Sequence, residues 1–178
     1  MANMKKYIIT AVTLGVIAAT SGLLIGLTNM ITRDQIARNE VAKVQSGIKS
    51  IFGDNIVVGE EKEVWEGYQH KYADSYYVVK DSANTDIGFA VRTSGSNMYG
   101  KISLIVGIEQ TNLKFVGLSI VTNEQTYATT LVDNYITPVN DGTRSVEDVS
   151  CGATYGAKLV RDMVNDAQKA IEDTVNGR

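Results

Sequence analysis

Residues 148–156, DVSCGATYG, hold the side chains of this chain that are best placed to do chemistry. They lead into a predicted final helix that begins near Gly152, and the first turn of a helix offers unpaired N–H groups and a positive dipole end, which favour an anion such as phosphate. Gly152 lets the backbone approach a bulky group, Ala153 adds little bulk, and Thr154 presents a hydroxyl near the anion. The same residues also suit an ordinary helix start, with Ser150 as N-cap and Thr154 on the surface. Composition and spacing do not decide between these two interpretations.

The chain has one cysteine, Cys151, and one histidine, His70. This count rules out an internal disulfide and a zinc or iron-sulfur cage built from cysteine and histidine. Cys151 is also a candidate reactive thiol, because a helix amino terminus lowers the pKa of a thiol. The chain has no second cysteine to resolve an oxidised state, and His70 is distant in sequence. A hydrolase is disfavoured, since no Ser/His/Asp arrangement surrounds the single histidine.

Segment 148–154 resembles the flavinylation motif D-x-x-(S/T)-G-A-(T/S) of FMN-binding domains, which occur in the G subunit of Rnf complexes and the C subunit of the sodium-pumping NADH:quinone oxidoreductase. The resemblance implies an FMN joined through its phosphate to the Thr154 hydroxyl by a phosphoester. It also implies a separate flavin transferase that uses FAD and magnesium and recognises a motif shaped by Asp148 and Gly152. Cys151 stands where the motif has serine or threonine, so a bound but non-covalent FMN is the alternative. The candidate cofactor-binding residues of the motif are Asp148, Ser150, Cys151, Gly152, Ala153 and Thr154.

The resemblance extends beyond the motif and covers most of the chain, except about residues 55–85. An anchor, a continuing helix, a GFAV strand, the run MYGKISLIVGIE, a strand ending in NEQT and a carboxy-terminal helix follow in the family's order. After the second strand the family typically has Glu-Thr-Pro-Gly, which touches the flavin, whereas this chain has Glu124-Gln-Thr126-Tyr127. The resemblance therefore makes Glu124 and Thr126 further candidates for cofactor binding. A solvated polar turn is the alternative.

The amino-terminal region is predicted to anchor the chain in a membrane. Residues 7–32 contain no charged side chain and as a helix span about 39 Å, more than the hydrocarbon core of a bilayer. Lys5 and Lys6 precede them, so the positive-inside rule predicts a cytoplasmic segment 1–6 and an extracytoplasmic domain over residues 33–178. A cleaved secretory signal is the alternative. A lipoprotein is disfavoured, because no cysteine lies near the end of the segment.

Periodicity predicts the elements that must position the motif. After the anchor, apolar residues at a 4-3-4-3 spacing predict that the helix continues as an amphipathic helix to Phe52, where Gly53-Asp54-Asn55 stops it. Between residues 60 and 86 only YYVVK has clear strand character. Three strand-like runs follow, IGFAVRT, KISLIVGIE and LKFVGLSIVT, divided by SGSNMYG and QTN. With a last helix whose apolar face holds Val160, Val164, Ala167 and Ile171, the order predicts an α+β domain with an antiparallel sheet packed against helices.

Charge and composition narrow the function. The formal net charge is -3 with no basic block, which disfavours nucleic-acid binding. With the resemblance, the leading hypothesis is a membrane-anchored flavoprotein that carries electrons through covalent FMN. It would be a redox subunit of an Rnf-type ion-translocating ferredoxin:NAD oxidoreductase, with other membrane subunits as partners. The rivals are a stand-alone extracellular flavoprotein electron carrier and a cofactor-free anchored binding module.

Overall fold

The computed structural model describes residues 2–64 and 70–177, with the side chains of all of these except residues 2, 3, 34 and 37. The chain divides into two compact units, Met1–Ala42 and Lys43–Arg178. One long helix, α1, runs over Ala2–Phe52, so its last turns belong to the second unit.

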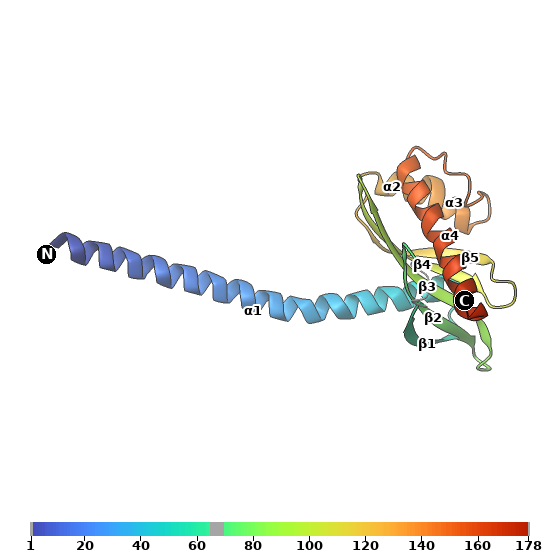
Figure 1. The fold of residues 1–178 in the computed structure, drawn as a ribbon, viewed down its shortest axis with the longest axis horizontal. Helices are drawn as coiled ribbons and strands as arrows, with labels where there is room; N and C mark the ends of the chain where they lie inside the picture. Colours follow the sequence, from blue (N-terminus) through green and yellow to red (C-terminus); the bar gives the residue numbers. More distant parts are fainter. Residues whose placement is uncertain (1, 65–69, 178) are drawn as a thin grey trace. The chain divides into compact units, whose positions relative to one another are not determined.

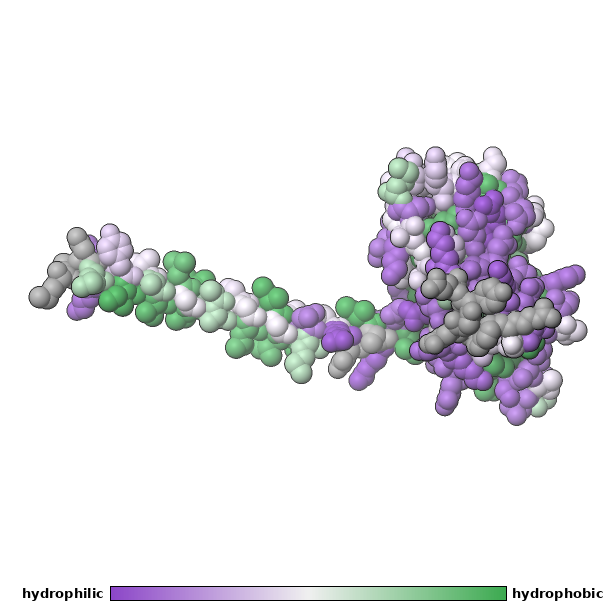
Figure 2. Space-filling model, viewed as in Figure 1, coloured by the Kyte–Doolittle hydropathy of each residue, from purple (hydrophilic) through white to green (hydrophobic). Residues whose placement is uncertain are grey.

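The first unit is an apolar stretch of helix. Every side chain from residue 4 to residue 33 is exposed, and Figure 2 shows hydrophobic residues along this part of α1. Four hydroxyls in it donate to the carbonyl four residues earlier at 2.8 to 3.0 Å, those of Thr10, Thr13, Thr20 and Thr28. Their polar groups are thus satisfied inside the helix, as hydrocarbon requires. In the described part of the chain, α1 is the one helix long and apolar enough to cross a membrane, which fits a single-pass membrane protein.

The second unit is built on an antiparallel sheet, as predicted, and this sheet has five strands. Its strands follow in the order β1-β2-β3-β4-β5, each pairing with its neighbour in sequence (Figure 1). Their bounds are β1 Ile56–Glu63, β2 Ala73–Asp81, β3 Asp86–Asn97, β4 Gly100–Glu109 and β5 Phe115–Asn123. The sequence had indicated only β2 between residues 60 and 86, because β1 ends in the charged run EEKE, which lacks strand character.

The divider predicted between β3 and β4 is wrong. Ser94, Gly95, Ser96 and Asn97 continue β3 in unbroken register with β4, and only Met98 and Tyr99 form the turn. Small polar residues have weak strand propensity, but here the long neighbouring strand supplies partners for their backbone groups. The consequence is a long hairpin that carries Tyr99 at its tip.

Apolar side chains alternate between the two faces of the sheet and form two cores. On one face, Val44 and Ile48 from the last turns of α1 pack against Ile105 and its neighbours. On the other face, helix α4, Thr154–Asn176, covers the sheet, and its predicted apolar residues Val160, Val164, Ala167 and Ile171 are all buried (Figure 1).

Both long helices end as glycine chemistry predicts. At Gly53 φ is +94°, and the Gly53 N–H donates to the Lys49 carbonyl at 2.8 Å, which confirms the predicted stop after Phe52. Gly177 ends α4 with φ at +65°.

A helical segment that the sequence did not predict follows β5. It consists of α2, Ala128–Leu131, a π-helical turn η1, Val132–Ile136, and α3, Thr137–Asn140. Its inward residues Leu131, Tyr135, Ile136 and Val139 join the α4 core, and this burial offsets a threonine-rich, proline-containing sequence with low helix propensity.

Candidate functional site

The amino terminus of α4 is the centre of the candidate site. Thr154 is the first residue of the helix, Ala153 is its N-cap, and the first intrahelical bond runs from the Ala157 N–H to the Ala153 carbonyl at 3.0 Å. No side chain of the described residues caps this end, and the first turn holds no acidic residue. Ser150 is therefore not the N-cap, contrary to the ordinary interpretation of the motif. The N–H groups of this turn and the positive dipole end remain available to an anion.

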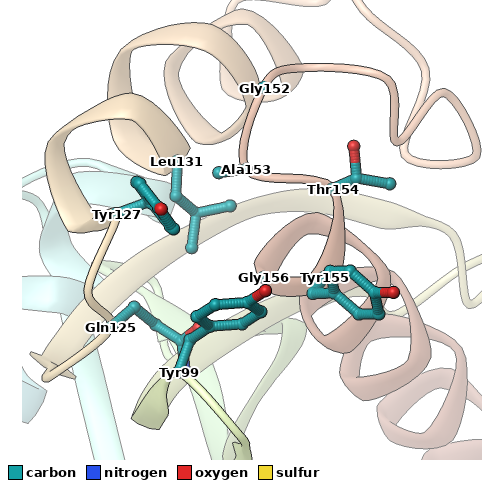
Figure 3. A pocket seen from close by; sticks show the side chains of 9 residues that line it. All are labelled: Tyr99, Gln125, Tyr127, Leu131, Gly152, Ala153, Thr154, Tyr155 and Gly156. Atoms are coloured by element: carbon teal, nitrogen blue, oxygen red, sulfur yellow. The ribbon is translucent and has the colours of Figure 1, made fainter.

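A cavity of about 290 Å³ opens beside this helix end, close to the lower bound for small-molecule sites (Figure 3). The motif residues Gly152, Ala153 and Thr154 line it. It is also lined by Tyr99, Gln125, Tyr127, Leu131, Tyr155 and Gly156. Thr154 is half-buried, and in Figure 3 its hydroxyl points away from the rings of Tyr99 and Tyr155. Thr154 thus lies at one end of the cavity lining, and the tyrosine rings form the other, aromatic end.

Gly152 and Gly156 flank Thr154 and Tyr155 at this end of α4. At Gly152 φ is +82°, a conformation that an L side chain rarely adopts. A Cβ at Gly156 would lie 3.0 Å from Leu131 Cδ2 and 3.5 Å from Gln125 Oε1. Both glycines line the cavity and add no side chain to it.

Three tyrosine rings meet at the aromatic end. The centroid of the Tyr99 ring lies 5.7 Å from that of Tyr127, with 62° between the planes, and 5.6 Å from that of Tyr155, with 46° between the planes. Tyr127 and Tyr155 are 52% and 60% exposed, respectively, so much of their surface is uncovered. This arrangement offers a planar ligand apolar surface with edge and face contacts.

The loop after β5 holds the cavity together but contributes different residues from those predicted. Gln125 is buried at 7% exposure and donates its side-chain amide to the Gly100 carbonyl. Thr126 is exposed and donates its hydroxyl to the Tyr99 carbonyl at 3.2 Å. Glu124 is exposed, and its N–H donates to the Lys101 carbonyl at 2.8 Å. Neither Glu124 nor Thr126 lines the cavity; Gln125 and Tyr127, their neighbours, do.

Asp148 and Ser150 lie in the loop before α4, outside the cavity lining, where Asp148 helps to shape the backbone. The Asp148 carboxylate accepts the Ser150 N–H at 3.3 Å and pairs with Arg144 at 3.6 Å. Arg144 also donates to the carbonyls of Asp148 and Ser150 at 3.2 and 3.0 Å. Asp148 thus positions the motif instead of contacting the cavity.

The π-helical turn η1 also holds the loop before α4, through two hydrogen bonds. Asn134 donates to the Cys151 carbonyl at 3.2 Å, and the Tyr135 hydroxyl donates to the Val146 carbonyl. Burial raises the pKa of the Tyr135 phenol, and the nearby Glu147 carboxylate adds to the shift. A π-turn widens the helix and re-aims side chains, which here brings two donors to one loop.

Cys151 is only 7% exposed and belongs to the core on the α4 face. Its burial shields the thiol from dissolved reactants, which argues against a reactive thiol. His70 lies beside Asp166 and Asp173 in the carboxyl half of α4, far along the helix from Cys151.

Comparison with known proteins identifies the first helix. Residues 1–51 match the family model of the RnfG N-terminal region. The resemblance to the Rnf G subunit is thereby confirmed over this segment, which corresponds to α1 almost from end to end. No curated protein matches the chain.

Beyond this RnfG-like segment, the site contains residues that sequence reasoning missed. Tyr99, Gln125, Leu131 and Gly156 come from three separate regions of the chain, and only the fold brings them together. The one available signal was the Tyr99-Gly100 pair in a predicted turn, where glycine marks a special backbone conformation. Gly100 indeed has φ at +134°.

Proposed function

We propose that this protein is a membrane-anchored flavoprotein that carries electrons through FMN bound by a phosphoester to Thr154. The observation that carries the proposal is that Thr154 is the first residue of an uncapped helix and lines a cavity of about 290 Å³. The helix end supplies donors for phosphate, and the tyrosines supply a surface for a planar ring. These residues fit both parts of a flavin nucleotide.

Each group of residues has a task in this proposal. The N–H groups of the first turn of α4 hold the phosphate, and the Thr154 oxygen provides its ester link. The chemistry that FMN supplies when bound is reversible electron transfer. Gly152 and Gly156 leave room for the ligand, and the exposed rings of Tyr127 and Tyr155 place its ring at the surface of the domain, where redox partners can approach.

The RnfG-like helix supports a place in a larger assembly. We propose that the protein serves as a subunit of an Rnf-type ion-translocating ferredoxin:NAD oxidoreductase and contacts other membrane subunits through α1. Lys5 and Lys6 favour a cytoplasmic amino terminus and an extracytoplasmic domain. A separate flavin transferase would break the pyrophosphate bond of FAD, transfer FMN to the Thr154 oxygen and release AMP, and the covalent link would prevent loss of the cofactor outside the cytoplasm.

The test is to express the full chain with a flavin transferase and measure the mass of the purified protein. We expect one FMN adduct on the wild type and on Thr154→Ser, and none on Thr154→Ala. Thr129→Ala, an exposed threonine of α2 outside the cavity lining, is the matched control and should be labelled fully. A wild type without the adduct, or a labelled Thr154→Ala, would refute the covalent link. Co-purification of other membrane subunits tests the assembly, and a labelled protein that purifies alone would favour the stand-alone carrier.

A further inference from the structure

We propose that Tyr99 is the stacking residue of the site, the ring against which the planar ring of the ligand lies, with Tyr127 and Tyr155 as its flanks. The inference rests on the proposed function, because it assigns the residues that recognise the ring of the nucleotide. It goes beyond that function by locating recognition at the tip of the β3–β4 hairpin, outside the flavinylation motif.

The first argument is the position of the Tyr99 ring between the other two. Its centroid lies 5.7 Å from Tyr127 and 5.6 Å from Tyr155, whereas the outer rings belong to different helices, Tyr155 in α4 and Tyr127 at the start of α2. Tyr99 is half-buried while both flanking tyrosines are more than half exposed. A partly covered central ring with exposed neighbours forms a shallow aromatic surface, to which a flat ligand can add a further contact.

The second argument is how firmly the backbone of Tyr99 is held. Its N–H donates to the Asn97 side chain at 2.8 Å, and its carbonyl accepts the N–H of Thr126 at 2.8 Å and the hydroxyl of Thr126 at 3.2 Å. Asn97 in turn donates to the Tyr155 carbonyl at 3.2 Å, which ties the hairpin tip to α4. The N–H of Tyr99 is thus fixed within the hairpin, and its carbonyl is fixed by the loop after β5.

The third argument is the fit of the following residue. Gly100 has φ at +134°, and a Cβ there would overlap the Glu124 carbonyl. The Gln125 amide donates to the Gly100 carbonyl from the cavity side. A surface turn without a role does not need such close packing, whereas a ring that must meet a ligand at a defined angle benefits from a fixed backbone.

The same contacts give the predicted loop a second role. Thr126, expected from the resemblance to touch the cofactor, uses its hydroxyl on the Tyr99 carbonyl instead. We infer that Thr126 acts as a positioning residue through Tyr99. This also accounts for an exposed threonine at a place where the side chain does not line the cavity.

The test uses the full chain in two forms. In the Thr154→Ala form, free FMN is titrated and followed by fluorescence anisotropy, which measures recognition without the covalent link. Tyr99→Leu should weaken FMN binding about tenfold, because it removes the stacked ring, and Tyr99→Phe should restore it. Met98→Leu, in the same turn but 81% exposed, is the matched control and should bind within about twofold of the parent. In the labelled form, Tyr99→Leu and Tyr99→Phe should both brighten flavin emission, because a stacked tyrosine quenches the flavin by donating an electron and phenylalanine is too hard to oxidise to replace it.

The outcomes separate this inference from the proposed function. A wild type that accepts the covalent flavin, combined with a Tyr99→Leu variant equal to its parent in affinity and emission, would overturn the stacking role alone. Weakened binding of free FMN in Tyr99→Leu, combined with no covalent adduct on the wild type, would support the stacking role and refute the phosphoester. A chain that binds flavin in neither form overturns both. Circular dichroism shows whether each variant is folded.

Discussion

The two halves of α4 use their polar groups in opposite ways. In the carboxyl half, the Asp166 carboxylate accepts the backbone N–H groups of Tyr72 and Ala73 at 2.7 and 3.0 Å and lies 3.6 Å from His70. At the amino end, no side chain of the described residues caps the helix, and glycines replace larger residues beside the cavity. The Asp166 carboxylate thus has its partners within the protein, whereas the amino end of the helix has no side-chain cap among the described residues. We therefore expect substitutions in the carboxyl half to change stability and substitutions at the amino end to change binding.

The largest effect on stability should come from Asp166→Ala in the carboxyl half of α4. The substitution leaves two partly buried N–H groups without their charged acceptor, so we expect the free energy of unfolding to fall by about 2 to 3 kcal/mol. Urea denaturation measures this loss. Asp162→Ala removes a partly exposed carboxylate that pairs with its neighbour Arg161 and should change stability by less than about 0.5 kcal/mol. If folded Asp166→Ala lost its flavin, the division between the halves would not hold.

A smaller effect, on binding alone, should follow from Gly156→Ala at the amino end. Alanine favours the helix by about 1 kcal/mol over glycine, but its Cβ would lie 3.0 Å from Leu131. The gain in helix propensity and the cost of this close contact should nearly cancel, so the free energy of unfolding should change little. The added methyl narrows the cavity and should weaken free FMN about tenfold in the Thr154→Ala form. Glu172→Ala, on the exposed face of the carboxyl half, controls for alanine in the same helix. Unchanged FMN affinity in Gly156→Ala would show that the ligand does not approach this turn.

The smallest effect should come from Tyr135→Phe, which tests the support of the loop between the two regions. Loss of the hydroxyl bond to the Val146 carbonyl should cost about 1 kcal/mol near neutral pH. Because burial raises the pKa of Tyr135 above its ordinary value of about 10, the unfolded chain releases the proton first. The contribution of the phenol is therefore fully present below about pH 10 and declines as pH rises further. The free energy of unfolding, measured from neutral to alkaline pH, should decline more steeply with pH in the wild type than in Tyr135→Phe. Equal slopes would contradict the raised pKa of Tyr135.

The sequence predicted those parts of the fold that depend on local pattern. The apolar run of α1, its stop at Gly53, the strands β3 to β5 and the buried face of α4 all follow from periodicity and glycine placement. The helical segment 128–140 could not be predicted in the same way, because its stability comes from burying Leu131 and Tyr135 against α4 and not from its own sequence.

In the candidate site, too, the sequence predicted the residues that belong to one local pattern and missed those that the fold brings together. Gly152, Ala153 and Thr154 are contiguous, so their motif placed them together at the cavity. Tyr99 and Gln125 lie far from these residues in the sequence. The pairing of β3 with β4 and the loop after β5 bring them to the cavity, and no local pattern in the sequence reveals this. Glu124 and Thr126 were selected by resemblance to a loop whose sequence differs here, and the chain turns Gln125 and Tyr127 to the cavity instead.

The continuity of α1 limits how the domain can be released from the lipid bilayer. Val44 and Ile48 are almost fully buried beneath the sheet, although they belong to the same helix as the apolar anchor. A water-soluble version that begins after Phe52 would expose the underside of the sheet and invite aggregation. A protease cut or a designed start before Lys43 keeps these two side chains, and with them the wall that supports the strands.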